Sequence, residues 1–547
     1  MIIQSNEPDV ILHNAHFYTL HSEYPIVTAV AIKNGRFQAL GANDEILALA
    51  GAATQTIDLQ GRAAIPGIFD SHNHLMQVGE KLSLIRLDEC TSPEELTELV
   101  RASAKDTPPG EWIVGLGWNE GNFKDGRLPT RHDIDPATAD HPVLLMRFFD
   151  LDVVNTPALK LAKIDRHTPD PQGGKIEHDP DGEPNGLLRA SAKHMVRNLL
   201  PRPTLEDRKN WIRLGMQEMH RFGITSIIDP GLTAEEIRAY QSLYADGDLT
   251  MRMNLMPSWH GFHTFEDPQQ LEERARQLGI FSGLGDEWLR IGALKMALDG
   301  GTTPHTAYMY EPFIGETEVC DFNRMDSQSL EDYFRTAQKL GWDVGIHCCG
   351  DRAQDMVVEA LAKVMEECPQ PDPRHSIIHA YFPSPRALEL MSRHQIAAVI
   401  QPTFIYFEGE LVFRDVGEKR AHHFKPTRTY LDHGILVTAS SDVESTVSAN
   451  PFNALYSLVT RKNRFGQPIG PDEGISRTQA LIAYTESGCW LTREEKLKGS
   501  IAIGKLADLA VLDRDYFLVA EEEIKDIQVS MTLVGGRIVW QQGEHTQ

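Results

Sequence analysis

The sequence predicts an α/β protein whose main domain is a barrel of parallel strands surrounded by helices. In the middle of the chain, short apolar segments alternate with helical segments such as 330–340 and 353–367, which is typical of a parallel sheet. The apolar segments are 224–229, 291–295, 344–347, 376–379 and 435–440. The chain has 547 residues, and this length favours a barrel with a further domain over an open sheet.

Both ends of the chain predict β structure. The strand-like segments are 10–12 and 28–32 near the start, and 507–512 and 531–534 near the end. Asn34-Gly35 follows the second segment and is a strong hairpin signal. We therefore expect residues 1–65 and 498–547 to form one composite β domain, with a barrel domain of residues 66–497 inserted between them.

Residues 80–205 do not follow the alternation of strands and helices. They contain Trp112, Trp118, several prolines and a stretch rich in Gly and Asp at 171–186. We expect this part to be an inserted subdomain or a lid over the mouth of the barrel.

Composition indicates an ordinary globular protein, with 41% hydrophobic and 24% charged residues. The formal net charge of −25 argues against nucleic acid or an anionic membrane as a partner, because phosphate binding needs clustered cations. The start of the chain has no signal-peptide pattern, and no apolar run reaches the ~18 residues of a membrane span. The six cysteines form no Cys-x-x-Cys pair, which favours reduced thiols and a cytoplasmic location.

Metal-binding residue types recur where the predicted strands end. His72 and His74 follow the apolar run 63–69, and side chains two apart on a strand share one face, so both imidazoles can reach one ion. His347 and His379 each end a strand about thirty residues apart. Since the carboxyl ends of barrel strands converge on one mouth, these residues are expected to lie together.

Two further strand ends carry ionisable groups. Asp442 follows the segment 435–440, and Lys295 ends the segment 291–295. Imidazoles and a carboxylate suit a divalent ion that activates water, and the carboxylate could then act as general base. Each residue has a structural alternative: a satisfied core histidine, an N-cap aspartate, or a lysine in a salt bridge, perhaps with Asp299.

Several motifs in order resemble the amidohydrolase superfamily, and specifically its YtcJ-like branch, which includes N-substituted formamide deformylases. The resemblance covers nearly the whole chain and is specific because all the blocks occur together. The blocks are Ala64–His74 with its "DxHxH" pattern, Phe222–Asp229, the "KxxxDG" block Leu294–Gly300, the "HxxGDxA" block His347–Ala353, Ile378–Ala380, Gln401–Thr403, Ser441–Asp442 and the "GKxAD" block Gly504–Leu509.

The resemblance implies a (β/α)8 TIM-type barrel with a composite β-sandwich and one or two divalent ions, usually zinc. His72 and His74 would bind the first ion, and His347 and His379 the second. Lys295 would be a carboxylated lysine that bridges them, and Asp442 would bind metal and act as base. Some relatives use a single ion.

The sequence departs from the branch in two places. Asp150 stands where relatives often carry a histidine, and Pro304 and His305 replace a common run in 300–307. Both segments are expected to line the substrate pocket. The candidate substrate-binding residues are Arg147, Asp150, His305, Tyr308 and Arg352, for which a purely structural contact is an equal alternative.

The expected function is hydrolysis of a C–N bond, of amide type, in a small molecule. Ester or lactone hydrolysis, deamination and non-oxidative decarboxylation would use the same ligands and are the alternatives. A barrel that has lost its metal is disfavoured because all six candidate ligands are present. A homodimer is compatible with the sequence but not indicated by any residue.

Overall fold

The computed structural model describes residues 7–124, 126–147, 151–258, 272–273, 276, 279–443 and 448–543. The chain divides into two compact units, one of Met1–Leu75 with Met216–Gln547 and one of Met76–Gly215. Each unit is described by itself. None of the described helices is both long enough and apolar enough to cross a bilayer.

Two parallel sheets form the centre of the larger unit. The first has the order β17-β16-β15-β8 and the second β18-β19-β20-β21-β22, with every neighbouring pair parallel. The strands are β8 (Ile68–Asp70), β15 (Ile224–Leu232), β16 (Arg252–Pro257), β17 (Leu289–Ile291), β18 (Leu294–Ala297), β19 (Val344–Cys348), β20 (Ser376–His379), β21 (Ala397–Ile400) and β22 (Val437–Ala439).

Two backbone contacts join the two sheets. A parallel bridge joins Ser258 to Lys295, and the backbone nitrogen of Ser71 donates to the carbonyl of Ala439 at 3.4 Å. This arrangement is consistent with the expected closed barrel. Five strand residues pack with Cys489, which lies in the helical segment 486–491, into one buried cluster; they are Phe69, Ile228, Met256, Ile378 and Val399.

The expected strand at 291–295 is instead two strands, β17 and β18. The extended strand is interrupted at Gly292, whose backbone nitrogen donates to the carbonyl of Leu255 at 2.7 Å. A Cβ at Gly292 would lie 1.9 Å from the side-chain oxygen of Asn254, so a larger residue here would have to displace that side chain. The interruption separates the two sheets and leaves Lys295 on the second.

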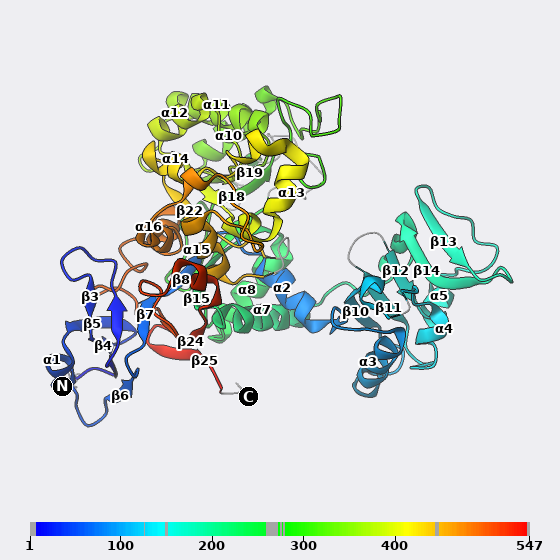
Figure 1. Ribbon diagram of the computed structural model, residues 1–547, viewed down its shortest axis with the longest axis horizontal. Coiled ribbons are helices and arrows are strands. Elements are labelled where there is room, and N and C mark those ends of the chain that lie inside the picture. Colours follow the sequence, from blue (N-terminus) through cyan, green and yellow to red (C-terminus); the bar gives the residue numbers. More distant parts are fainter. Residues whose placement is uncertain are drawn as a thin grey trace. The chain divides into compact units, whose positions relative to one another are not determined.

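Helices follow the strands, as the alternation predicts. They include α8 (Ala234–Asp246), α10 (Ser327–Lys339), α11 (Asp351–Glu367), α12 (Pro385–His394), α13 (Pro402–Ala421), α14 (Thr427–Asp432), α15 (Pro451–Thr460), α16 (Arg477–Ala483) and α17 (Glu486–Leu491). Side-chain caps begin several of them: Thr233, Asp326 and Ser384 accept from the third residue of α8, α10 and α12. Figure 1 shows α10, α11 and α12 together beside β18 and β19.

Strands from both ends of the chain share one sheet, in the order β25-β24-β23-β7-β2-β3. These strands are β2 (His16–Tyr18), β3 (Ile26–Val27), β7 (Ala63–Pro66), β23 (Leu509–Leu512), β24 (Val529–Val534) and β25 (Arg537–Gln541). A second sheet, β5-β4-β1-β6, contains β1 (Val10–His13), β4 (Ala29–Lys33), β5 (Arg36–Gly41) and β6 (Gln55–Asp58). Asn34 and Gly35, both with positive φ, make the expected hairpin between β4 and β5.

The smaller unit has its own six-stranded sheet, in the order β13-β14-β12-β11-β10-β9. Its strands are β9 (Ile85–Arg86), β10 (Ile113–Trp118), β11 (Val143–Arg147), β12 (Leu151–Val154), β13 (Gly174–His178) and β14 (Pro184–Ala190). Helix α3 (Pro93–Asp106) contributes Leu96 and Val100 to a core that contains Trp118. Residues 80–205, expected to break the strand–helix alternation, thus lie within a separate compact unit.

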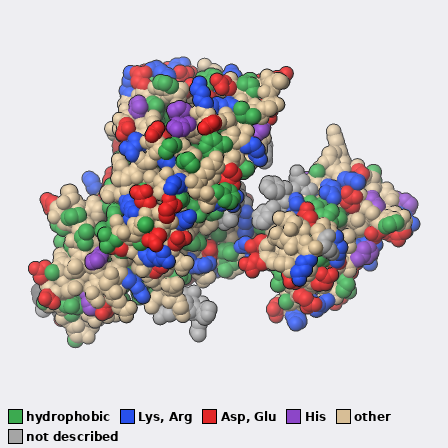
Figure 2. Space-filling view, viewed as in Figure 1, with side chains coloured by type: hydrophobic (Ala, Val, Ile, Leu, Met, Phe, Trp, Pro, Cys, Tyr) green, Lys and Arg blue, Asp and Glu red, His purple; other side chains and the backbone are tan. Residues whose placement is uncertain are grey.

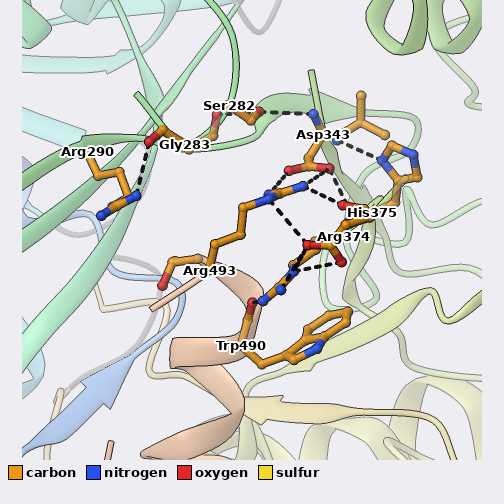
Figure 3. A network of polar contacts seen from close by, with 12 residues as sticks. Ser282, Gly283, Arg290, Asp343, Arg374, His375, Trp490 and Arg493 are labelled. Atoms are coloured by element: carbon orange, nitrogen blue, oxygen red, sulfur yellow. Dashed lines mark hydrogen bonds and ion pairs between the residues drawn. The ribbon is translucent and has the colours of Figure 1, made fainter. Parts of the chain in front are cut away.

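A polar network ties the amino ends of β19 and β20 to the segment after α17 (Figure 3). Asp343, directly before β19, pairs with Arg493 and accepts from the backbone nitrogen of Arg374 at 2.8 Å. Arg374 in turn pairs with Glu495 at 2.9 Å. His375 accepts from the backbone nitrogen of Val344 at 3.1 Å. These contacts lie at the strand ends opposite to those that carry the candidate metal ligands.

Charged side chains are spread over the surface. On the face drawn in Figure 2, Lys and Arg side chains are interspersed among the more numerous Asp and Glu side chains. No single-sign patch dominates that view.

Candidate metal centre and pocket

The structure brings together all six residues that the sequence marked at strand ends, and we call them the strand-end cluster. His72 and His74 follow β8, Lys295 lies in β18, His347 in β19, His379 ends β20, and Asp442 follows β22. They all line one cavity of about 290 Å³. The parallel strands explain the convergence, because their carboxyl ends face the same side of the sheets.

Asp442 lies at the centre of the strand-end cluster. Its Oδ1 is 3.6 Å from Nε2 of His72 and 3.4 Å from Nε2 of His74. Its Oδ2 is 4.0 Å from Nε2 of His379. Lys295 approaches the same group, with Nζ 3.5 Å from Nε2 of His72. The rings of His347 and His379 have centroids 4.2 Å apart.

The donor set fits a divalent metal ion. Ligand atoms of His72, His379 and Asp442 all lie within 4.8 Å of one another, and so do those of His347, Cys349 and His379. Within the described part of the chain, Nδ1 of His72 and Oδ1 of Asp442 are buried without a hydrogen-bond partner. Buried polar atoms are rarely left unpaired, and imidazole and carboxylate groups are typical ligands of zinc and related ions.

The backbone is strained where two of these side chains are presented. His379 has a φ of 76° and Asp442 a φ of 52°, a left-handed conformation that costs non-glycine residues about 1–3 kcal/mol. Such strain is concentrated at functional sites, where the surrounding structure holds it in place. For Asp442, the backbone nitrogen donates to the carbonyl of His72 at 2.8 Å, which fixes the two loops together.

Gln401 and Lys425 orient His379 from behind. Oε1 of Gln401 accepts from Nδ1 of His379 at 2.8 Å and from Nζ of Lys425 at 2.9 Å. Because Nδ1 carries this bond, Nε2 of His379 is directed to Asp442. Partners of this kind hold metal-binding histidines in one tautomer and one orientation.

Asp299 holds the loop after β19. Its carboxylate accepts from the backbone nitrogens of Cys349 at 3.0 Å, Gly350 at 2.8 Å and Tyr308 at 3.0 Å. The suggested salt bridge between Lys295 and Asp299 is therefore wrong. In the described residues no carboxylate lies within ion-pair distance of the Lys295 ammonium, which faces His72 instead.

Burial sets the ionisation of the pocket. It lowers the pKa of Lys295 to about 8 and that of His347 to about 4. It also raises the pKa of Asp70 to about 6, against the hydrogen bonds that stabilise its carboxylate. For Asp442, burial opposes ionisation, yet the imidazoles of His72, His74 and His379 hold its pKa well below the usual range. Burial lowers the pKa of His72 and His379 as well as that of His347, whereas the Asp442 carboxylate raises the pKa of His74 against burial. Neutral imidazole and carboxylate are the forms in which these groups bind a cation.

Unlike the strand-end cluster, the expected substrate-binding residues do not lie together in one cavity. Arg147 lies in the smaller unit, where it pairs with Glu120 at 2.7 Å, and Asp150 lies outside the described residues. His305 stacks on Phe313 and bonds to Glu316 at 2.6 Å, next to Pro304 of the cavity wall. Tyr308 and Arg352 are in contact, 4.4 Å from guanidinium to ring centre, but they line a second cavity and not the one lined by the strand-end cluster.

The segment 300–307, which was expected to line the substrate pocket, contributes Gly301, Thr302, Thr303 and Pro304 to the wall of this cavity. The sequence did not single out the remaining wall residues, which are Cys349, Tyr381, Phe404 and Glu408. Phe404 and Glu408 lie one helical turn apart on α13, and this i, i+4 spacing is the only signal that could have indicated a shared face. Gln401 and Lys425 carried no signal of a role at all, because their connection to His379 depends on packing.

The fold and the strand-end cluster together define a metal-dependent hydrolase of the α/β class. The sequence profile of the amidohydrolase family (Amidohydro_3) matches residues 55–540, and the chain belongs to this family. This match and the two sequence relatives described next confirm the expected resemblance to the YtcJ-like branch.

YtcJ of Bacillus subtilis is 28% identical over 542 residues, which cover 97% of this chain and 99% of that protein. The N-substituted formamide deformylase of Arthrobacter pascens is 27% identical over 549 residues, covering 96% and 97%. Among solved structures, an uncharacterized metal-dependent hydrolase from Pyrococcus furiosus has 27% identity and a TM-score of 0.74, covering 93% of this chain and 99% of that one.

Proposed function

We propose that the protein hydrolyses the C–N bond of a small-molecule amide with the help of one or two divalent ions, most suitably zinc. The observation that carries the proposal is the strand-end cluster, in which the imidazoles of His72, His74 and His379 lie within 4.0 Å of the Asp442 carboxylate and His347 lines the same small cavity. The likeness to an N-substituted formamide deformylase supports an amide as substrate class.

The strand-end cluster offers two ligand groups. His72, His74 and Asp442 would hold a first ion, and His347 and His379 a second. Lys295, whose Nζ lies 3.5 Å from His72 at the wall of the same cavity, would add a further ligand as a carboxylated lysine, because a carbamate supplies anionic oxygens in place of a buried ammonium. A bound divalent ion polarises a carbonyl group and lowers the pKa of water toward ~7.

The protein's own residues then supply proton transfer and orientation. Asp442 would accept a proton from the attacking water and return it to the leaving nitrogen, which needs it to depart as an amine. Gln401 keeps Nε2 of His379 directed into the pocket during this transfer. Tyr381 and Phe404 cover the cavity with aromatic surface, which limits water access beside the reacting groups.

A substrate screen on zinc-loaded enzyme tests the proposal. N-acyl amines, N-formyl amines, N-acyl amino acids and cyclic amides are supplied in isotopically labelled water, and the products are analysed by mass spectrometry. We expect a carboxylic acid that contains labelled oxygen, together with a free amine. Exclusive cleavage of esters or lactones, deamination without amide cleavage, or release of carbon dioxide without incorporation of label would overturn the amide assignment.

A further inference from the structure

Glu408 is an acidic side chain in the same cavity as the strand-end cluster, but it is not one of the candidate metal ligands. It lies on α13 and lines the cavity together with Thr303, Tyr381 and Phe404. Among the described residues it accepts one long hydrogen bond, of 3.5 Å, from the hydroxyl of Thr303. The carboxylate is therefore available to a molecule that enters the cavity.

The positive charge of Lys425 acts on Glu408 and lowers its pKa, but the two side chains form no ion pair. In the ranges that the structure describes, no Lys, Arg or His lies within ion-pair distance of Glu408. The ammonium of Lys425 is buried near by, yet it donates to Gln401 at 2.9 Å and to the carbonyl of His379 at 3.4 Å. Burial raises the pKa of Glu408 to about 6, so the carboxylate would be stabilised by a cation that arrives with the substrate.

Aromatic rings flank the acid on the cavity wall. Tyr381 and Phe404 are both buried and both line the cavity beside Glu408. The protein already places one ammonium against these rings, since Nζ of Lys425 lies 3.8 Å from the centre of Tyr381 and 5.1 Å from that of Phe404. Aromatic faces attract organic cations, and the apolar rings also accommodate an alkyl chain.

By contrast, the neighbouring acid on the same helix is already paired. Glu410 contacts the guanidinium of Arg464 at 3.0 Å and is not part of the cavity wall. Of these two glutamates, only Glu408 combines a cavity position with the lack of a close counter-ion in the described residues. This difference makes Glu410 a matched control.

We propose that Glu408 selects amides that carry a protonated amine, so that the substrate class is the monoacylated diamine or a similar cationic amide. The ammonium would contact the Glu408 carboxylate while the amide reaches the strand-end cluster. This inference rests on the proposed amide hydrolysis, and the net charge of −25 acts in the same sense by attracting cations to the protein.

Two matched substrates test the inference. Monoacetylcadaverine ends in an ammonium group, whereas N-hexylacetamide has a methyl group at the same position. We expect wild-type enzyme to have the higher kcat/KM for monoacetylcadaverine. In Glu408→Gln, the ratio of the two kcat/KM values should fall by about ten- to a hundredfold, because the carboxylate is lost and the volume is kept. In Glu410→Gln, the ratio should stay at the wild-type value.

A binding measurement separates this inference from the proposed reaction. Hexylammonium and hexanol are titrated into zinc-loaded protein by calorimetry, which needs no turnover. Binding of hexylammonium that is weakened by Glu408→Gln supports the inference even if no amide is hydrolysed. A ratio of kcat/KM that changes less than about twofold in folded Glu408→Gln, or calorimetric affinities that do not depend on Glu408, would overturn it while leaving amide hydrolysis standing.

Discussion

The carboxylate of Asp70 accepts two hydrogen bonds from Ser441, one from the backbone nitrogen at 2.9 Å and one from the hydroxyl at 2.6 Å. Asp70 ends β8 and Ser441 follows β22, so these bonds join two strands that are 371 positions apart in the chain. The same carboxylate accepts from the backbone nitrogen of His72 at 3.3 Å. One buried acid thereby places His72 and Asp442 side by side.

Replacing Asp70 tests this positioning role. In Asp70→Asn, one oxygen becomes an amide nitrogen that faces donors, so at least one bond to Ser441 or Asn73 is lost. We expect zinc affinity to fall by about ten- to a hundredfold, as for other groups that orient metal ligands. Competition with a chelator measures it. Ser441→Ala loses the hydroxyl that donates to Asp70 and accepts from the backbone nitrogen of Val443, but it keeps the backbone bond to Asp70 and should cost less. An equal or larger effect would contradict the role given to Asp70.

Gln401 should be needed for its oxygen and not for its volume. Gln401→Ala removes the acceptor of both His379 and Lys425, and we expect a loss of about ten- to a hundredfold in zinc affinity. Gln401→Glu retains an acceptor for both groups but loses the amide's bonds to the carbonyl of Val399 and the hydroxyl of Ser440, so it should restore part of the affinity. Failure of the glutamate variant to do better than alanine would contradict the role given to the oxygen.

The pair of Arg252 and Asp508 connects β16 with β23. Two hydrogen bonds of 2.6 and 2.9 Å join the guanidinium to the carboxylate, and both side chains are buried. Asp508→Ala leaves the arginine without its partner, and we expect a loss of about 3–5 kcal/mol in the free energy of unfolding. Denaturant unfolding followed by fluorescence measures it. The exposed pair of Arg386 and Glu389 provides the comparison, since Glu389→Ala should cost less than about 1 kcal/mol.

His375 should make the protein less stable in mild acid. Burial lowers its pKa from 6.5 to about 4, so below pH 6.5 the unfolded chain binds a proton that the folded protein does not. The stabilisation is complete above pH 6.5 and is lost as the pH falls to about 4, by about 3 kcal/mol in total. In His375→Asn, which keeps an acceptor for Val344, the melting temperature should fall less steeply over this range.

A second histidine serves as the control for this pH dependence. His433 has an exposed side chain, and His433→Asn removes one histidine without changing the buried network. Its melting temperature should follow the wild-type curve between pH 6.5 and 4. If the melting temperature of His375→Asn fell with pH as steeply as that of the wild type, burial of His375 would not contribute to the acid sensitivity.

The sequence was most informative where one pattern carries both structure and chemistry. Each member of the strand-end cluster lies in a parallel strand or directly after one, so strand prediction and residue type together were enough to bring His72, His347, His379 and Asp442 to one cavity. The hairpin at Asn34-Gly35 was predictable for a similar reason, since the turn chemistry is local.

Contacts that depend on packing were not predictable. The sequence suggested Asp299 as a salt-bridge partner of Lys295. In the structure the Asp299 carboxylate instead accepts hydrogen bonds from three backbone nitrogens of other loops. Tyr308 and Arg352 were expected at the substrate, yet their side chains line another cavity. Glu408 could not be distinguished from Glu410 by sequence, because only the fold determines which acid meets Arg464 and which faces the cavity.

Metal content tests the central claim most directly. Wild-type protein and the variants His72→Ala and Asp442→Asn are purified gently, dialysed against zinc and measured by elemental mass spectrometry, with circular dichroism as a check on folding. The account predicts about one or two equivalents of zinc in the wild type and a clear loss in both folded variants. Less than a small fraction of one equivalent in the wild type, or undiminished zinc in Asp442→Asn, would contradict it.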